Sequence, residues 1–383
     1  MNTQAKIYRV ALLSSGLGHV HRGIETWTED LAACLAQQKI AVTLYKGGGR
    51  RKKGYEKVIS CLHRDNPFSR WVIKNRPGFL WRFGLGTGYI LEETTFVVNL
   101  LPELLYRQYD IIHTQDPQVA DFLQSVKKSG LLKSKVILAH GTEEPFDFLK
   151  RFEYVQHLAP FHQQEMEHYG RNGTRSFAIG NFINTEHFKP EQKGNLRREL
   201  NIPENAFVVL SVAAIKRTHK RIDYLIEEFS HVQDSNAYLV IVGSHGEETR
   251  DLVSEGKEKL GQRVIFLANY SRHRIHEVYG MADLFVLCSL KEMMPIAILE
   301  ALASGVPVVG HRYPVIEWMV GTGGEGIDMS QKNNLARTIQ KYSLDQNLRN
   351  QKSQLAREQA VNHFSEGIIL KQILEMYREV LES

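Results

Sequence analysis

The sequence has few cysteines and no long apolar run. Its three cysteines, Cys34, Cys61 and Cys288, are too few and too widely spaced for a disulfide framework or a metal-binding cluster. No stretch approaches the roughly 18 consecutive apolar residues that a membrane-spanning helix needs, and the N-terminus lacks the apolar core of a signal peptide. These absences argue against a disulfide-rich secreted domain and a membrane-spanning protein. We therefore expect a cytoplasmic location.

Acidic residues are scarce in one region of the chain. The whole sequence carries 48 Lys and Arg against 43 Asp and Glu, a net charge of +5. Residues 46–82 contain eleven Lys and Arg but only Glu56 and Asp65, so this basic segment carries +9 (11 − 2) and the rest of the chain −4 (5 − 9). Aromatic side chains lie among or just after its cations: Trp71, Phe79, Trp81, Phe83 and Tyr89. Such a segment, which we predict to be irregular, suits an anionic membrane surface, an anionic acceptor or single-stranded nucleic acid, and a solvated loop is the remaining alternative.

Strand and helix patterns alternate along most of the chain, which is typical of parallel sheets covered by helices. With 383 residues the chain is longer than one ordinary core requires, so two domains are expected. Residues 184–205 are polar, contain two prolines and are predicted to be a hinge. We expect domains over residues 1–183 and 184–363, followed by a final helix over residues 364–383.

The most informative stretch holds two glutamates eight positions apart. Glu292 precedes a predicted helix and Glu300 lies within it, while Pro295 stands near the first turn and Gly305 follows the end. Residues 282–289, which are mostly apolar, are predicted to be a buried strand that leads into this loop. A strand, an acidic loop and a helix N-terminus in this order form a ligand site at the carboxyl end of a parallel sheet.

These residues resemble the E-x7-E element of retaining glycosyltransferases of the GT-B fold, and they look most like glycosyltransferase family 4. The resemblance implies a nucleotide-diphosphate sugar as donor, with Glu300 on the ribose hydroxyls and Glu292 on the donor sugar. Pro295 removes one backbone N–H from the loop, and the amides of Met294 and Ile296 remain available to the donor.

A basic loop that includes Lys216 and Lys220 lies between a predicted strand and a predicted helix. The resemblance implies that this loop supplies cations to the diphosphate of the donor. Lys220 aligns with the family lysine, but Ala214 stands where the family has an arginine. Lys216 or Arg217 is the candidate substitute, and a solvated basic loop is the alternative.

Three further positions are candidate site residues by the same resemblance. Gly23 begins the first helix in a Gly-Ile-Glu sequence that looks like the family's Gly-Val-Glu, so this helix N-terminus is expected to face the phosphates. Tyr270 follows a strand and is a candidate for stacking on the nucleobase. His140 follows the predicted strand 135–139 and resembles the family's active-site histidine near the donor sugar. His113 is similarly placed, and a site role and a structural role are equally open for it.

The fold expected is GT-B: two Rossmann-like α/β domains whose parallel sheets face each other across a cleft. The first domain is expected on the acceptor side, the second is expected to bind the nucleotide sugar, and the last helix to cross back to the first domain. The expected reaction transfers a sugar to an acceptor hydroxyl with retention of configuration, in glycan, polysaccharide or glycolipid biosynthesis. No cofactor is expected, and no metal, since the sequence has no Asp-x-Asp motif.

The expected partners are a nucleotide sugar and an acceptor whose identity cannot be read from the sequence. One hypothesis is a lipid-linked acceptor, with peripheral contact to the inner face of the membrane through residues 46–82. Three alternatives stay open: a nucleotide-sugar epimerase of the same architecture, a non-catalytic nucleotide-sugar-binding relative, and a nucleic-acid-binding protein. The last would account for residues 46–82 but not for Glu292 and Glu300, so no nucleic acid is expected.

Overall fold

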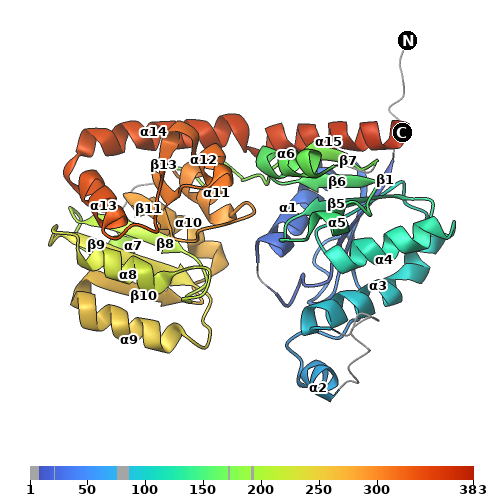
Figure 1. The fold of residues 1–383 in the computed structure, drawn as a ribbon, viewed down its shortest axis with the longest axis horizontal. Helices are drawn as coiled ribbons and strands as arrows, with labels where there is room; N and C mark the ends of the chain where they lie inside the picture. The colour runs from blue at the N-terminus through green and yellow to red at the C-terminus, as the bar shows by residue number, and fades with distance from the viewer. Residues whose placement is uncertain (1–7, 21, 76–85, 171–172, 191–193) are drawn as a thin grey trace, which may run out of the picture. The chain divides into compact units, whose positions relative to one another are not determined.

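The computed structural model of the chain describes residues 8–20, 22–75, 86–170, 173–190 and 194–383. They form two compact units, which we call unit 1 (residues 1–180 and 370–383) and unit 2 (residues 181–369) (Figure 1). Each unit is a parallel sheet covered by helices. The predicted α/β class with two Rossmann-like domains is therefore confirmed.

Unit 1 contains a seven-stranded sheet in the order β3-β2-β1-β4-β5-β6-β7, and all of its paired strands are parallel. Its strands are β1 (Arg9–Ser14), β2 (Ala41–Lys46), β3 (Glu56–Val58), β4 (Ile111–Thr114), β5 (Lys135–His140), β6 (Tyr154–His157) and β7 (Arg175–Ala178). Its helices are α1 (Gly23–Gln37), α2 (Pro67–Asn75), α3 (Gly88–Arg107), α4 (Pro117–Lys128), α5 (Phe146–Leu149) and α6 (Pro160–Tyr169).

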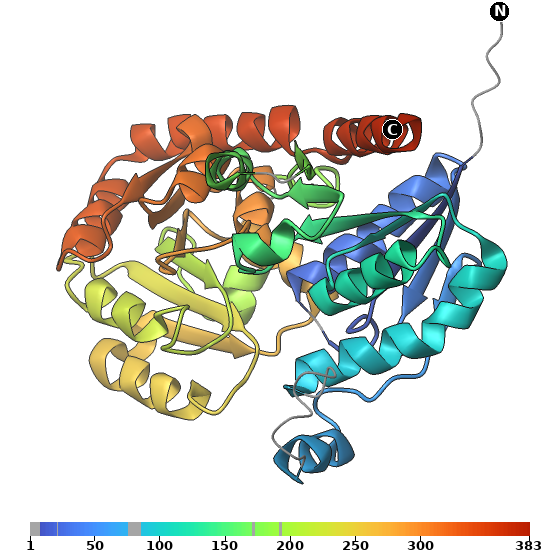
Figure 2. The ribbon, with the colours of Figure 1, turned by 45° about the vertical axis from the view of Figure 1, so that its right-hand side comes forward.

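The strands of unit 1 are apolar because helices cover both faces of the sheet. On one face, Ala11 and Leu13 of β1 share a buried core with Phe96 of α3 and Leu123 of α4. These two helices lie side by side in both views (Figures 1 and 2). On the other face, residues of α1 and of the last helix, α15 (Glu366–Glu382), pack against the sheet.

Unit 2 contains a six-stranded parallel sheet in the order β10-β9-β8-β11-β12-β13. Its strands are β8 (Phe207–Val212), β9 (Ala237–Gly243), β10 (Val264–Ala268), β11 (Leu284–Leu287), β12 (Val308–His311) and β13 (Gly324–Ile327). Its α-helices are α7 (Gly194–Glu199), α8 (Ile222–Ser230), α9 (Thr249–Leu260), α10 (Ile275–Gly280), α11 (Ile296–Ala303), α12 (Pro314–Val320), α13 (Asn334–Leu344) and α14 (Gln346–His363), joined by short 3-10 turns η2 (Gly261–Arg263), η3 (Arg272–Arg274) and η4 (Gly321–Gly323).

Two layers of helices enclose the sheet of unit 2. Helices α8, α9 and α13 pack together on one side, and α11, α12 and α14 on the other (Figure 1). The sequence of α11 is apolar nearly all round, as expected of a helix buried between a sheet and another helix. This burial fixes the position of the one charged residue of α11, Glu300.

The basic segment, which we predicted to be irregular, contains β3 and α2. The prediction is wrong because β3 adds to the edge of the sheet and α2 packs against α3, contacts that composition does not reveal. Acidic residues neutralise part of its charge through the ion pairs Lys46–Glu56, Lys57–Glu103 and Arg64–Glu92. Phe79, Trp81 and Phe83 lie outside the described residues.

Residues 184–205, predicted to be a hinge, form part of unit 2. The unit boundary lies between Gly180 and Asn181, and the segment contains α7. Arg197 of α7 is 1% exposed, and its guanidinium donates to the backbone carbonyls of Met281 and Ala206, each at 2.9 Å. One arginine of this polar segment is therefore buried and has a structural role.

Candidate active site

Lys220 lies in the loop that joins β8 to α8. The residues on either side of it, His219 and Arg221, have φ angles of +68° and +52°, in the left-handed region that costs energy for residues other than glycine. Arg221 is held in place by its guanidinium, which donates to the carbonyl of Met329 (3.1 Å) and lies 4.0 Å from the ring centroid of Tyr224. The loop therefore holds Lys220 in one direction at a local energetic cost.

Lys220 is directed at Glu292, and the two side chains form an ion pair. Glu292 lies between β11 and α11 and is 9% exposed. A second contact links the same loops, because Nε2 of His219 donates to the carbonyl of Lys291 at 3.0 Å. Since strand order reverses between β8 and β11, these loops meet at the switch point of the sheet, where open α/β sheets bind ligands. The structure thus brings Lys220 and Glu292 together.

Glu300 is 1% exposed; one of its carboxylate oxygens accepts a hydrogen bond, and the other lies in an ion pair. The hydroxyl of Tyr279 donates to Oε2 at 2.6 Å, and a guanidinium nitrogen of Arg272 lies 2.8 Å from Oε1. Burial raises the pKa of Glu300, while the charge of Arg272 lowers it. Tyr279 is fully buried, whereas the side chain of Arg272 is 55% exposed. Tyr279 is therefore a fixed partner of Glu300 in the core, whereas a ligand can replace Arg272.

Neither Arg272 nor Tyr279 is predicted as a site residue from the sequence. Tyr279 lies in α10, where an aromatic residue is expected in any hydrophobic core, and no local pattern points to Glu300. Arg272 follows Tyr270 by two residues, so its position beside a predicted nucleobase contact was the one available signal.

Helix α11 begins at Ile296 and Pro295 is its N-cap, one residue before the first turn where we expected it. Met294 is 5% exposed, and Asn181 donates a side-chain N–H to its carbonyl at 3.2 Å. The amide of Ile296 lies in the first helical turn, whose N–H groups have no acceptor within the helix. Gly305 follows the helix with φ +69°, as its predicted closing role requires.

Lys216 and Arg217 differ in their surroundings. The guanidinium of Arg217 donates to Glu255 of α9 at 2.8 Å, and its backbone N–H donates to Glu248 at 2.9 Å. Lys216 is partly exposed and forms no ion pair within the part of the chain that the structure describes. Because α9 engages Arg217, Lys216 is the better candidate for a second phosphate ligand.

Tyr270 follows β10 and is partly exposed. The preceding residue, Asn269, has φ +54°; its N–H donates to Gly243 at 2.8 Å and its side-chain oxygen accepts from His245 at 3.0 Å. Arg274 lies 5.8 Å from the centroid of the Tyr270 ring. The turn is thus well defined, and stacking of Tyr270 on a base stays a prediction.

In unit 1, His140 ends β5 and is 4% exposed. Its Nδ1 lies 3.2 Å from Nδ1 of His157, and its ring centroid lies 5.9 Å from that of His162. Burial lowers the pKa of His157 to about 3, which keeps that ring neutral. His140 therefore belongs to a buried histidine cluster within unit 1, and its role near the donor sugar stays a prediction.

Gly23 is the first residue of α1, as predicted within one position. The side chain of Glu25 turns back toward this helix start: it accepts from the Arg22 N–H at 3.1 Å and from the Arg22 guanidinium at 2.7 Å. A carboxylate of the chain already interacts with the helix start that we expected to face phosphates. A phosphate contact there stays a prediction.

His113 has a structural environment. It is fully buried, its Nδ1 lies 2.8 Å from the hydroxyl of Tyr377 in α15, and the ring of Trp27 packs edge-on against it. Burial lowers its pKa to about 3. Of the two roles left open for His113, these contacts favour docking of the C-terminal helix.

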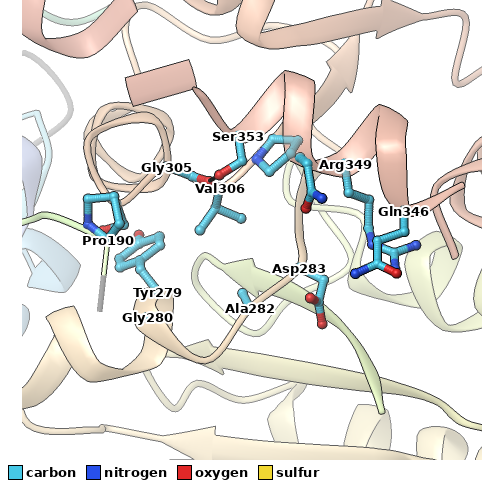
Figure 3. A pocket seen from close by; sticks show the side chains of 13 residues that line it. Pro190, Tyr279, Gly280, Ala282, Asp283, Gly305, Val306, Gln346, Arg349 and Ser353 are labelled. Atoms are coloured by element: carbon cyan, nitrogen blue, oxygen red, sulfur yellow. Dashed lines mark hydrogen bonds between the residues drawn. The ribbon is translucent and has the colours of Figure 1, made fainter. Parts of the chain in front are cut away.

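A cavity of about 210 Å³ lies at the opposite, amino-terminal edge of the unit 2 sheet (Figure 3). Asp283, which precedes β11, and Val306, which precedes β12, line it together with Arg349 of α14. None of the site residues predicted from the sequence lines this cavity. Tyr279 links the cavity to the predicted site, because it lines the cavity and donates its hydroxyl hydrogen to Glu300.

The residues that the structure describes offer neither a metal-binding cluster nor a membrane-spanning helix. Within those ranges, no group of three or more His, Cys, Asp or Glu residues is arranged to hold a metal ion. Over the same ranges, no helix combines the length and apolar character that crossing a bilayer requires.

Comparison with solved structures defines the class of fold. A sucrose-phosphate synthase from Thermosynechococcus elongatus superposes with a TM-score of 0.81 at 18% identity, covering 98% of this chain and 99% of that one. At this identity the likeness shows the fold alone, which is GT-B.

Part of the chain also matches a known family. Residues 192–359 match the model of the family described as "Glycosyl transferases group 1". One relative is the N-acetyl-alpha-D-glucosaminyl L-malate synthase of Bacillus anthracis, 26% identical over 206 residues, which are 53% of each chain. Another is the alpha-monoglucosyldiacylglycerol synthase of Streptococcus pneumoniae, 25% identical over 313 residues, or 78% of this chain and 70% of that one. The match spans about half the length of the malate synthase.

Proposed function

We propose that this protein is a retaining glycosyltransferase that moves a sugar from a nucleotide-diphosphate sugar to an acceptor hydroxyl. The observation that carries the proposal is the meeting of Lys220 and Glu292 at the switch point of unit 2, with the buried Glu300 in the helix that follows. A cation suits a diphosphate, and carboxylates suit ribose and sugar hydroxyls as charge-assisted acceptors. The match of residues 192–359 to the glycosyl transferase family model supports the same class of chemistry independently.

Donor binding on this account exchanges partners within ion pairs that already exist. The diphosphate takes the Lys220 ammonium from Glu292, and the freed Glu292 carboxylate accepts from hydroxyls of the donor sugar. The ribose hydroxyls take Oε1 of Glu300 from the exposed Arg272, while Tyr279 keeps Oε2 in place. Because the charged groups are positioned before the donor arrives, little reorganisation is needed at the reaction step.

In the transfer step the bond between the anomeric carbon and the diphosphate oxygen breaks. The acceptor oxygen bonds to that carbon from the same face, so configuration is retained. The acceptor proton passes to an oxygen of the departing diphosphate. Lys220, the first amides of α11 and Lys216 stabilise the negative charge that grows on the leaving group. We propose that no metal ion takes part.

We further propose that the acceptor is lipid-linked and that α2 brings unit 1 to an anionic membrane surface. Phe68 and Trp71 of α2 are 55% and 61% exposed, and their rings stack on one another. Arg70 and Lys74 of the same helix are exposed as well. An aromatic pair beside cations suits the interface of an anionic bilayer. The diacylglycerol in the name of one relative supports a lipid acceptor.

The test of transfer is an assay of nucleoside diphosphate release from UDP-, GDP- and ADP-sugars, with and without acceptor lipids. A transferase releases the nucleotide only when an acceptor is present. A change in the sugar without an acceptor would indicate an epimerase, and tight binding without turnover would indicate a non-catalytic relative. Activity in excess EDTA is expected, and its loss with rescue by Mg²⁺ would overturn the metal-free step.

Membrane contact is tested by cosedimentation with anionic liposomes at low salt. Replacing Phe68 and Trp71 by Ser should remove most of the binding. Replacing the exposed Arg50, Arg51, Lys52 and Lys53 by Ser should weaken it, by about 1 kcal/mol for each charge that is near the surface. Both variants should keep donor affinity. If the parent protein does not cosediment with anionic liposomes, a soluble acceptor becomes the better proposal.

A further inference from the structure

The cavity of unit 2 lies at the amino-terminal edge of the sheet, whereas the loops that hold Lys220 and Glu292 follow the carboxyl ends of the strands (Figure 3). Its volume of about 210 Å³ is several times that of one water, roughly 30 Å³, and lies below the roughly 300–1,000 Å³ of pockets for drug-sized ligands. The exposed residues Pro190, Gln346 and Asn350 belong to its lining, so the cavity opens to solvent. A small molecule can therefore enter it, but a nucleotide sugar is too large.

Arg349 of α14 places a cation in the wall of this cavity. One guanidinium nitrogen, Nη1, donates to two carbonyls at the end of α13, those of Tyr342 and Ser343, the latter at 2.8 Å. The guanidinium carbon also lies 5.4 Å from the centroid of the Phe207 ring. The N–H groups on Nη2 and Nε have neither an acceptor nor an acidic partner among the described residues. The cavity therefore has a positioned guanidinium whose remaining donors are available to a ligand.

The other charges near the cavity are already paired. Among the described residues that line it, Asp283 is the one further charged residue, and its Oδ2 accepts from the guanidinium of Arg197 at 2.7 Å. Arg197 is 1% exposed, so its charge stays beside that carboxylate. Asp345, the N-cap of α14, accepts from the Leu348 N–H at 2.8 Å and does not line the cavity. The unpaired charge in the wall is the positive charge of Arg349, which favours an anion.

Neutral groups form the rest of the wall. Figure 3 shows Tyr279 and Pro190 at one end of the cavity and Arg349 at the other. Ser304 also lines the cavity; it is 5% exposed, and its hydroxyl has no hydrogen-bond partner among the described residues. Buried polar atoms are nearly always paired by protein, water or ligand. The wall therefore suits a molecule with an anionic group at one end and a short neutral body that carries hydroxyl groups.

The wall of the cavity also holds Glu300 in place. Tyr279 lines the cavity and donates its hydroxyl hydrogen to Oε2 of Glu300 at 2.6 Å. Ser304 and Gly305 follow α11 and line the cavity too, and the Ser304 N–H donates to the carbonyl of Glu300 at 3.0 Å. The hydroxyl of Ser353 in α14 donates to the carbonyl of Gly305 at 2.6 Å. A molecule in the cavity therefore contacts both the ring and the helix end that position Glu300.

We propose that this cavity is a second ligand site, which binds a small organic anion with a phosphate or carboxylate group and thereby strengthens nucleotide binding at Glu300. Arg349 donates to the anion, and the neutral body packs against Tyr279. An occupant that restricts the Tyr279 ring stabilises the partner of Glu300, and by linkage the nucleotide strengthens binding of the anion by the same factor. Binding of the anion stands on the cavity alone, whereas its effect on the nucleotide rests on the proposed function.

Calorimetric titration with glycerol 3-phosphate, glycerate and glycerol tests the class of ligand, because the three share a three-carbon body and differ in charge. One or both anions should bind about tenfold or more tightly than glycerol, and the tighter one assigns the anionic group. Each titration is repeated with Lys220→Ala, since an anion at the donor site would lose its affinity in that variant and an anion in the cavity would keep it. Binding of none of the three, equal binding of glycerol, or loss of binding in Lys220→Ala would overturn the inference.

The variant Asn350→Asp and its matched control Asn347→Asp locate the site. Both asparagines are exposed near the start of α14, but only Asn350 lines the cavity. A carboxylate at position 350 should weaken anion binding by about tenfold through like-charge repulsion, and one at position 347 by about twofold at most. Arg349→Gln should remove the binding, with its unfolding temperature measured because the contacts to α13 are lost as well. Equal weakening in the two asparagine variants, or unchanged binding in Asn350→Asp, would contradict the site.

The effect on the donor site is measured as the affinity for UDP, GDP or ADP, whichever binds, at a saturating concentration of the anion. Asn350→Asp at the same concentration reports direct competition at the donor site, so the parent should bind the nucleotide about fivefold or more tightly than this variant. Without the anion the two proteins should bind it equally. Equal affinities with the anion present would contradict the coupling. If the anion binds as predicted but no nucleotide binds with or without it, the second site is supported and the proposed function is overturned.

Discussion

The switch points of the two units hold different chemistry. In unit 2 the loops after β8 and β11 meet through a pair of opposite charges, Lys220 and Glu292, which are 19% and 10% exposed at the side chain. In unit 1 the loops after β1 and β4 meet through a backbone N–H and the fully buried carboxyl group of Asp116. The first arrangement has a cation that a diphosphate can take over, whereas the second pairs a carboxyl group with a backbone N–H.

The same sheet topology therefore fixes where these residues lie but not which chemical groups they carry. At both points, loops that follow neighbouring parallel strands are brought together. The residues in those loops decide which chemical groups each switch point presents. Substitutions that remove one kind of group should therefore affect one substrate and spare the other.

The largest expected effect is at Lys220. Lys220→Ala should lower kcat by roughly 100- to 1,000-fold, because charge on the leaving diphosphate grows toward the transition state. The comparison variant is Lys216→Ala, whose effect should have the same sign but be smaller, since Lys216 is not paired with Glu292. The measurement is steady-state release of nucleoside diphosphate. Equal losses in the two variants would show that the two lysines share the role, and no loss in Lys220→Ala would remove it from the site.

The next effect concerns nucleotide binding at Glu300. Glu300→Gln should weaken nucleotide binding by about 1.5–3 kcal/mol, the usual worth of a charge-assisted hydrogen bond. Glu228→Gln is the matched control: Glu228 is 3% exposed and accepts from two backbone N–H groups, those of Asn333 and Ala336. Calorimetric titration should show weaker binding in the first variant only. A folded Glu300→Gln protein with parental affinity would exclude Glu300 from the ribose site.

A stability effect tests the structural part of unit 1. The pKa of His113 is lowered to about 3, so the native protein favours the neutral ring. Its contribution to stability is complete above the unfolded pKa of about 6.5 and is lost as pH falls toward 3. Between pH 7 and pH 5 the parent should lose about 2 kcal/mol more unfolding free energy than His113→Asn. Urea unfolding at both pH values measures this, and parallel losses would mean that His113 is already protonated or accessible.

The smallest effect concerns Tyr279, which positions Glu300. Tyr279→Phe should weaken nucleotide binding by about 1 kcal/mol, because one hydrogen bond to the buried carboxylate is lost. It should also reduce discrimination between a ribonucleotide and its 2′-deoxy analogue, which a purely structural role would not change. Tyr342→Phe, at another buried tyrosine of unit 2, is the control. Unaltered discrimination in Tyr279→Phe would assign Tyr279 to the core alone.

Local sequence signals predicted some elements well. The sequence predicts a helix over residues 117–128, because proline stands at its first position and Ser-Gly follows its end, and α4 spans Pro117–Lys128. The sequence also predicts a helix over residues 92–107, but α3 begins earlier, at Gly88, because Thr87 caps it by accepting a hydrogen bond from the Ile90 N–H. The Gly and aromatic residues around this start look irregular in the sequence. Strong end signals give accurate boundaries, and weak ones do not.

The positions of Glu292 before α11 and of Glu300 within it were predictable, because the two residues are close in sequence and follow a family motif. It was not predictable where a partner comes from a distant element. The hydrogen bond from Arg217 to Glu255 joins residues that are 38 positions apart. The hydrogen bond from Tyr279 to Glu300 depends on α10 packing beside α11. Such pairs are fixed by tertiary packing, which a single sequence does not reveal.

The central claim is that the Lys220–Glu292 switch point of unit 2 binds a nucleoside diphosphate sugar. A thermal-shift titration of the parent and of Lys220→Ala with UDP, GDP, ADP and their sugars tests it most directly, because a ligand that binds the native state raises its apparent stability. We predict that one nucleotide raises the unfolding temperature of the parent by several degrees, about 2–4 °C for each kcal/mol, and that Lys220→Ala largely loses this shift. No shift with any of them at millimolar concentration, or equal shifts in parent and variant, would contradict the claim.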